Sequence, residues 1–505
     1  MAKNSWIMKL LYLLVTVCFL GILAINIYDF IVFLKDLWTS HKGSFFTILV
    51  LAVMIIALLL YTKKRKMKNP LMKCRPMVFA IIVFTVSFII RLLFVLIVNT
   101  QQYSDFQLFY WVTADIANKT FKYLSQSYFS VWAYQVGFPT LMSPILMIFG
   151  TKVLPLLIVN CVFMAVTSVF IYFTVLELSS EKAARMFSLA YVFFPFGLGL
   201  SSVYTNQHLA AMFLYMGFYI LIRGRKFGII RSVLAGILFA LSNVARPEAI
   251  IVILSILVYA LFTLFSKAKK TGLKSKFRQV ILPVGCSVLI YFIGSLGISK
   301  FIVSSGINPH GLSNNFPLYK FVIGLNHSTS GTFSSEDAEH LLNTPAFTEN
   351  PDLRNKEAMK MIRERLSAGP AKLGTLFLKK ARIMWSCNPS WYPAFYGFDP
   401  DRTIRLLGMD ISLKHFPDIF TGIDFTFFIL IFLSGIMGML SALRSGEDHP
   451  ALGIAALMFL AAFSAFSLIE VQHRYSYFIF PLLFVIASAG FERASRKRGS
   501  SDGSA

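Results

Sequence analysis

The sequence predicts an all-α polytopic membrane protein with about 12 transmembrane helices, and three observations lead to this fold class. The chain of 505 residues is 56% hydrophobic and only 14% charged, with a mean hydropathy of +0.67. Apolar runs long enough to cross a bilayer recur along it. Basic residues cluster between these runs, notably at 63–68 and 267–278. The net charge of +24 therefore indicates topology and contact with anionic membrane lipids, and no motif supports nucleic-acid binding.

The predicted spans place both chain termini on the inner side of the membrane. The first run lacks a small-residue cleavage site and is interpreted as a span, not a cleaved signal peptide. The twelve spans are residues 6–33, 45–61, 76–98, 153–176, 186–203, 209–222, 229–243, 250–265, 280–302, 425–443, 451–468 and 475–490.

Three segments between these spans need a different interpretation. Residues 99–134 are polar and aromatic, which predicts helices lying on or just above the membrane. Residues 136–149 are apolar but short and contain Pro139 and Pro144, so they are either a full span or half-inserted. The half-inserted alternative is adopted because it places every later basic loop inside. Residues 303–419 form a long outer region, with helices expected around 336–342 and 353–366.

These assignments divide the chain into five parts. The predicted parts are an N-terminal pair of spans with a basic inner loop (1–75), a transmembrane core (76–302) whose first outer loop is 99–152, an extracytoplasmic region (303–419), the C-terminal spans (420–491) and a basic cytoplasmic tail (492–505). The five cysteines are scattered and show neither disulfide nor metal-ligand spacing.

Polar residues at the outer ends of the spans are the candidate functional groups. Carboxylates there can deprotonate a hydroxyl, and arginines can pair with two phosphate oxygens at once. Each also has a structural alternative: Asp105 as a loop acid in an interfacial aromatic belt, Arg246 before Pro247 as a helix boundary, Glu470 and Arg474 as a helical ion pair, and His208 as a packed side chain.

Taken in order, several segments resemble a known family. They are "YFSVWAYQVGFPTLMSPILMIFG", "TNQH", "NVARPEAI", "GLNHSTSGTFSSED" and "EVQHRYSYFIFPLLFVIASAG". Over roughly residues 76–490 the chain resembles the GT-C glycosyltransferases, in the branch of protein O-mannosyltransferases and lipid A aminoarabinose transferases. The better signals are "ARPE" and "HRY…P", in which the proline is Pro481.

The resemblance implies an inverting hexosyltransferase that takes a sugar from a polyprenyl-phosphate carrier at the outer face of the membrane. Asp105 matches the catalytic acid of the first loop, and Asp115 is its rival, because Ser104-Asp105-Phe106 replaces the Asp-Glu pair of mannosyltransferase-type members. The expected donor-phosphate ligands are Arg246, Arg474 and His473. The expected substrate contacts are Tyr103, His208, Glu248, Asn326, Glu470 and Tyr475.

The first outer loop has no DxD motif or His/Asp cluster with metal spacing, so neither a metal nor another cofactor is expected. The expected partners are a polyprenyl-phosphate-linked sugar and a cell-surface glycan, glycolipid or protein acceptor, in a plasma membrane of bacterial type. Two other functions stay open: a transporter or flippase for a lipid-linked or small substrate, and a cell-envelope polysaccharide polymerase. A transporter is expected to carry ionisable residues at mid-membrane. Arg91 is one of few such charges, and we expect it to snorkel outward.

Overall fold

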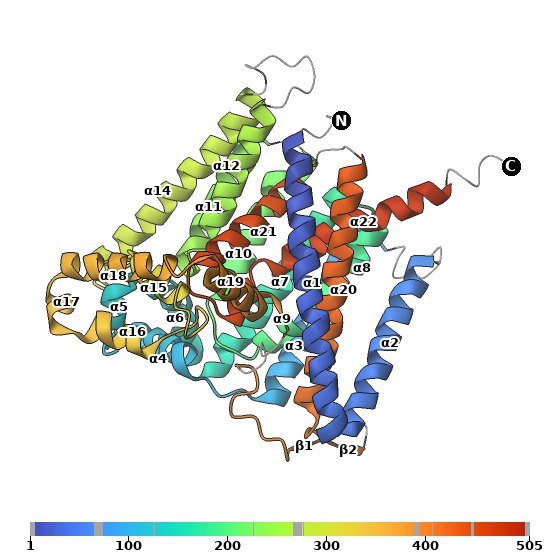
Figure 1. The fold of residues 1–505 in the computed structure, drawn as a ribbon, viewed down its shortest axis with the longest axis horizontal. Coiled ribbons are helices and arrows are strands. Elements are labelled where there is room, and N and C mark those ends of the chain that lie inside the picture. Colours follow the sequence, from blue (N-terminus) through green and yellow to red (C-terminus); the bar gives the residue numbers. More distant parts are fainter. Residues whose placement is uncertain are drawn as a thin grey trace.

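The structure is a computed structural model in which long helices form a bundle and shorter helices run across one side of it (Figure 1). It describes residues 6–64, 74–124, 127–225, 227–265, 275, 277–387, 393–406, 408–445 and 449–499. The predicted inner basic runs fall largely outside these ranges, as does the end of the basic tail. The inside–outside assignment therefore stays a prediction, although α1 begins and α22 ends toward the same end of the bundle (Figure 1).

The elements follow one another without long irregular segments over much of the described chain. The first half contains α1 (Trp6–Ser40), α2 (Lys42–Lys64), α3 (Pro76–Val98), α4 (Ser104–Asn118), α5 (Ser127–Val131), η2 (Ala133–Val136), α6 (Gly137–Phe149), α7 (Val153–Leu178), α8 (Glu181–Val192), α9 (Pro195–Leu200), α10 (Gln207–Ile222), η3 (Arg223–Arg225) and α11 (Ile229–Ala245). The second half contains α12 (Ala249–Phe265), η4 (Phe277–Ile281), α14 (Leu282–Ser304), α15 (Leu318–Gly324), α16 (Ser335–Ala338), η5 (Glu339–Asn343), α17 (Pro345–Glu349), α18 (Pro351–Leu366), α19 (Pro370–Trp385), β1 (Thr403–Leu406), β2 (Met409–Ser412), α20 (Phe416–Ser445), α21 (Pro450–Leu468), η6 (His473–Ser476) and α22 (Phe480–Gly499).

The helical, multi-pass character predicted from the sequence is confirmed. Within the described ranges, six helical segments are long and apolar enough to cross a membrane: Trp6–Ser40, Pro76–Val98, Val153–Leu178, Phe277–Ser304, Phe416–Ser445 and Pro450–Leu468. Six shorter apolar helices accompany them: Lys42–Leu58, Ala133–Phe149, Gln207–Ile222, Ile229–Ala245, Ala249–Leu264 and Phe480–Phe491. The total of twelve spans and the half-insertion of 136–149 stay predictions.

Three details differ from the sequence prediction. The predicted span 186–203 is not one helix, because α8 ends before Pro195 and the extended Phe194 (φ −65°, ψ 114°) precedes α9; the residue before a proline avoids the helical region. The last long helix begins at Phe480, not at 475. The chain is also not purely helical, since β1 and β2 pair in antiparallel register, with Thr403 opposite Ser412.

The predicted outer region is built from short helices, as expected. Residues 336–342 fall in α16 and η5, and residues 353–366 fall in α18. Asn350 caps α18 through its side chain, which accepts from the backbone N–H groups of Asp352 and Leu353. The helices α15 and α18 run across the direction of the long helices (Figure 1), so the region predicted to be outside covers one side of the bundle.

The core is formed by large aromatic side chains and by glycines where helices touch. Phe428 of α20 packs against Phe480 of α22 with ring centroids 4.9 Å apart, and Phe194 lies 5.4 Å from the same ring. A Cβ atom on Gly438 of α20 would lie 2.2 Å from the carbonyl oxygen of Ile486 in α22. Small residues allow such close approach of helices in a membrane, where packing provides much of the association energy.

Arg91 does not reach outward from α3 as predicted. Its side chain is completely buried in the bundle, and its guanidinium donates to the carbonyl oxygen of Ser87 at 3.1 Å. Ser87 in turn lies 3.0 Å from Ser168 of α7. A buried cation inside a helix bundle requires polar partners. Ser87 is that partner for Arg91 within α3, and the hydrogen bond between Ser87 and Ser168 joins α3 to α7.

Replacing Gly438 by alanine tests the close contact between α20 and α22. We expect Gly438→Ala to destabilise the protein by about 1–3 kcal/mol, because the helices must move apart to admit the methyl group. The measurement is the thermal unfolding midpoint in detergent. The matched control is Gly21→Ala in α1, where an added Cβ meets no atom within 4 Å. An equal midpoint for both variants would contradict the packing described here.

Candidate active site

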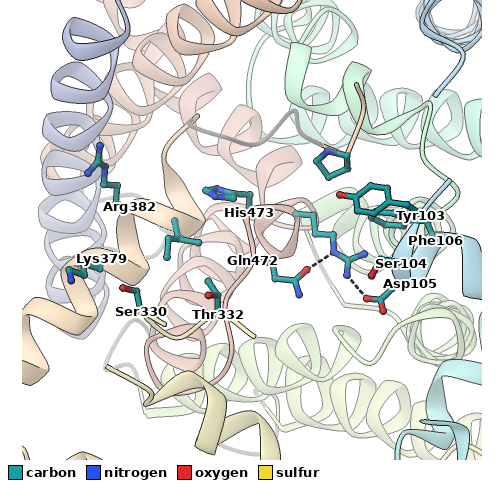
Figure 2. Close-up of a pocket in the computed structure, with 13 residues that line it drawn as sticks. Tyr103, Ser104, Asp105, Phe106, Ser330, Thr332, Lys379, Arg382, Gln472 and His473 are labelled. Atoms are coloured by element: carbon teal, nitrogen blue, oxygen red, sulfur yellow. Dashed lines mark hydrogen bonds and ion pairs between the residues drawn. The ribbon is translucent and has the colours of Figure 1, made fainter. Parts of the chain in front are cut away.

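A cavity of about 800 Å³ opens among the predicted first outer loop (99–152), α19 and the segment between α21 and α22. Figure 2 shows Lys379 and Arg382 on one side of it, Asp105 on the other, and Gln472 and His473 between them. The lining residues are Tyr103, Ser104, Asp105, Phe106, Ser330, Thr332, Lys379, Arg382, Ile383, Pro393, Gln472, His473 and Arg474. The cavity therefore combines one carboxylate with one imidazole and three cationic side chains.

Asp105 is held at the cavity by the chain that leads into α4. The side chain of Gln102 accepts from the backbone N–H of Tyr204 at 2.8 Å and donates to the carbonyl oxygen of Ser202 at 3.0 Å. The next residues turn sharply, with Ser104 in the left-handed region (φ 49°), and Asp105 lies in the first turn of α4. The N-terminus of a helix favours a negative side chain, so this position suits a charged acid.

Arg474 faces Asp105 across the cavity wall. Its Nη2 donates to Asp105 Oδ2 at 2.6 Å, and the guanidinium carbon lies 4.5 Å from the centroid of the Phe106 ring. The Arg474 side chain is 11% exposed, whereas that of Asp105 is 35% exposed. A guanidinium so placed holds the acid in one orientation and leaves part of the carboxylate open to the cavity.

A chain of polar contacts continues behind Arg474. Gln472 Oε1 accepts from Arg474 Nε at 2.8 Å, and Gln472 Nε2 donates to Glu470 Oε1 at 3.1 Å. Glu470 is paired with Lys320 of α15. Glu470 and Arg474 thus have different partners and do not form the helical ion pair considered as an alternative, because this segment is extended up to η6.

Backbone contacts fix the segment that carries Gln472 and Arg474. The N–H of Glu470 donates to the carbonyl oxygen of Lys320 at 2.8 Å, and that of Val471 donates to Gly331 at 2.9 Å. Lys380 of α19 donates from Nζ to the carbonyl oxygens of Gly324, Ser467 and Ile469, at 2.6, 2.8 and 2.8 Å. These hydrogen bonds hold three segments together beside the cavity: residues 320–331, the N-terminal part of the segment between α21 and α22, and α19.

His473 lines the cavity as a neutral imidazole at pH 7. Burial lowers its pKa to about 4, and its Nδ1 has no hydrogen-bond partner within the described part of the chain. The sequence analysis predicts that His473 is a phosphate ligand. As a neutral imidazole it can contact a phosphate only as a hydrogen-bond donor, without a positive charge.

Tyr103, which the sequence analysis expected to contact substrate, also lines the cavity. Its ring stacks on that of Tyr396, with centroids 4.1 Å apart. Tyr475 lies behind the cavity wall, near both predicted arginines: its ring centroid is 4.9 Å from the guanidinium of Arg246 and 5.7 Å from that of Arg474.

Arg246 and Glu248 do not line the cavity. They form an ion pair with each other, and Arg246 Nη1 also donates to Asn206 Oδ1 at 3.2 Å. Their side chains are only 14% and 8% exposed. The pair lies at the turn between α11 and α12. Arg246, which the sequence analysis assigned to the donor phosphate, thus has Glu248 as its counter-ion.

The remaining predicted residues have local structural contacts. Asp115 is buried and accepts from Thr120 Oγ1 at 2.7 Å and from the N–H of Tyr123, which fixes the turn after α4. His208 is buried and contacts the carbonyl oxygen of Leu200 and the Tyr477 hydroxyl, at 2.9 and 3.0 Å. Asn326 donates to Asp337 at 2.8 Å. None of the three is among the cavity-lining residues.

Sequence reasoning missed Lys379 and Arg382 of α19. Arg382 is oriented by Asp29 of α1: its Nη2 lies 2.6 Å from Asp29 Oδ1, and its Nε donates to Oδ2 at 3.1 Å. Ser386 donates to the same carboxylate at 2.6 Å. The available signal was a cluster of basic residues at 372–382 in a region predicted to be outside, where lysine and arginine are sparse.

Comparison with known proteins confirms the predicted resemblance over part of the chain. Residues 136–293 match the model of the dolichyl-phosphate-mannose-protein mannosyltransferase family. The chain resembles the GT-C glycosyltransferases. The matched segment extends from η2 into α14, and all thirteen cavity-lining residues lie outside it.

Two solved structures of the Archaeoglobus fulgidus oligosaccharyltransferase also match. The apo form is 14% identical with a TM-score of 0.42, and the complex of AglB with an inhibitory peptide and a dolichol-phosphate is 13% identical with a TM-score of 0.43. Each match covers 84% of this chain and 52% of the other, so this chain spans about half the length of those proteins. No curated protein matches.

The pKa of His473 predicts a pH dependence of stability. The folded value of about 4 lies below the ordinary value of 6.5, so the unfolded chain binds more protons between these values and stability falls as pH decreases from 6.5 to 4. In His473→Asn, which cannot take up this proton, the thermal midpoint should fall less across that window than in the intact protein. Parallel pH curves for the two proteins would contradict the low pKa.

Proposed function

We propose that this protein is a membrane glycosyltransferase that transfers a sugar from a polyprenyl-phosphate-linked donor to a cell-surface acceptor. The observation that carries the proposal is the arrangement of one cavity, with a partly open carboxylate on one side and Lys379 and Arg382 on the other. A sugar phosphate and an acceptor hydroxyl need these two kinds of group. The family match over 136–293 supports the same class of reaction.

In the proposed step, the acceptor hydroxyl oxygen attacks the anomeric carbon and the bond from that carbon to the phosphate oxygen breaks. The hydroxyl proton goes to Asp105, and the bonding pair leaves with the polyprenyl phosphate. A single displacement of this kind inverts the anomeric configuration, so the proposed enzyme is an inverting transferase. Positive groups near the leaving phosphate stabilise its growing charge.

The donor phosphate is assigned to Arg382, Lys379 and Arg474, with His473 as a neutral donor. Arg474 retains the role predicted from the sequence. Arg382 and Lys379, which line the cavity, replace Arg246, which does not. The Arg382 side chain is 50% exposed although its partner Asp29 is fully buried, so part of the guanidinium is available to a ligand.

The Asp105–Arg474 pair gives the free enzyme a resting state. When a phosphate approaches Arg474, it competes with Asp105 for the guanidinium. Release from the ion pair frees Asp105 Oδ2, which now accepts a hydrogen bond from Arg474 Nη2, to accept one from the acceptor hydroxyl instead. Asp105 is thus the proposed base. Asp115, the alternative from the sequence, is not, because Thr120 and Tyr123 already hold its carboxylate.

Removing the charge of Asp105 tests its role. We expect Asp105→Asn to lower the rate of transfer from radiolabelled polyprenyl-phosphate sugars by about 10²–10⁴-fold, the usual contribution of a general base. The matched variant is Asp115→Asn, which should retain transfer when corrected for the amount of folded protein. Full activity of the first variant with loss in the second would reverse the assignment.

Neutralising Arg382 tests the phosphate assignment. We expect Arg382→Gln to lower kcat/KM for the donor by at least about tenfold, since a hydrogen bond to a charged group contributes about 1.5–3 kcal/mol. Inhibition by free polyprenyl phosphate should weaken in parallel. The control is Arg363→Gln, which removes an exposed arginine of α18. Unchanged inhibition of Arg382→Gln by polyprenyl phosphate would refute the assignment.

A further inference from the structure

Three side chains with metal-ligating atoms meet where the junction of α1 and α2 touches the start of α20. His41 Nδ1 lies 2.8 Å from Asp418 Oδ2, and His415 Nδ1 lies 4.0 Å from the same oxygen. The two imidazole rings have centroids 5.1 Å apart at an angle of 70°. One ligand atom from each residue falls within 4.8 Å of the other two.

The backbone holds these residues in position from both sides. His41 lies between Ser40 and Lys42, and helical hydrogen bonding continues through it: its N–H donates to Leu37 at 2.8 Å and its carbonyl accepts from Phe45 at 3.2 Å. His415 precedes α20, and its carbonyl accepts from the N–H of Ile419 at 3.1 Å. His415 and Asp418 are three residues apart, a spacing that places both on one helix face.

The chemistry of the three groups suits a borderline transition metal. Imidazole nitrogen and carboxylate oxygen are ordinary ligands of Zn²⁺, with bonds of about 2.0–2.2 Å, so the ligand atoms of a tetrahedral site are about 3.4 Å apart. Side-chain rotations that move atoms by about 1 Å bring the three groups to that spacing. The side chains of His41, Asp418 and His415 are 45%, 27% and 46% exposed, which leaves room for rotation and for a water ligand.

We propose that His41, His415 and Asp418 bind one divalent transition-metal ion of the Zn²⁺ class. Asp418, in the first turn of α20, supplies the carboxylate ligand. The ion joins the α1–α2 junction to α20 and thus acts as a structural clip. None of its ligands lines the cavity of Asp105, so the site is separate from the proposed sugar transfer.

A direct test uses the full chain without a polyhistidine tag, in lipid nanodiscs, titrated with Co²⁺ as a spectroscopic probe for the Zn²⁺ site. We expect one Co²⁺ per chain, with the visible absorption of a tetrahedral N/O site, displaced by Zn²⁺. His41→Ala and His415→Ala should each weaken binding by at least about tenfold, because even the loss of an outer-shell partner of a metal ligand costs 10–100-fold. The control is His310→Ala, which removes an exposed histidine of another loop and should leave binding unchanged.

Thermal unfolding gives a second readout that does not depend on the enzyme's activity. Zn²⁺ should raise the midpoint of the intact protein and of His310→Ala, but not that of His415→Gln, which retains a polar side chain beside Asp418. Absence of Co²⁺ binding would leave only an imidazole–carboxylate pair and overturn the proposal. Equal binding by the intact protein and the His41 and His415 variants would also overturn it, since the ion would then lie elsewhere.

Discussion

The ion pair between Asp105 and Arg474 joins two residues that are 369 positions apart in the sequence, and the candidate site depends on it. The Arg474 side chain is only 11% exposed, and a charge so enclosed is costly without a partner. Arg474 is further restrained by Gln472 and by the Phe106 ring. The pair therefore fixes the start of α4 against the segment before α22 and sets one wall of the cavity.

The opposite wall of the cavity also depends on an ion pair, the one between Arg382 and Asp29. Arg382 borders the cavity because α1 supplies Asp29, a completely buried acid with two contacts to the guanidinium and one to Ser386. The N-terminal helix, which lies outside the segment matched by the mannosyltransferase family, thus contributes to the site. In our proposal the reaction uses both walls: the base on α4, and the cations of α19 that hold the leaving phosphate.

Hydropathy predicted most of the helices, because long apolar runs such as 76–98 have few alternatives in a bilayer. It failed where proline acts locally, as at Pro195, which divides the predicted span 186–203. Position at the outer ends of spans selected Tyr103, Asp105, His473 and Arg474, which line one cavity in the structure. It also selected Arg246, His208 and Asp115, whose partners are Glu248, Tyr477 and Thr120. Such contacts depend on tertiary packing, which span ends do not reveal. Arg382 was missed for a related reason, since its orientation depends on an acid 353 positions away.

The most direct test of this account is a cryo-electron microscopy structure of the protein in nanodiscs with bound polyprenyl phosphate. The account predicts the phosphate inside the cavity, in contact with Arg382 and Arg474, with the Arg474 guanidinium moved away from Asp105. A phosphate bound at Arg246, with the Asp105–Arg474 pair intact and the cavity beside α19 empty, would contradict it.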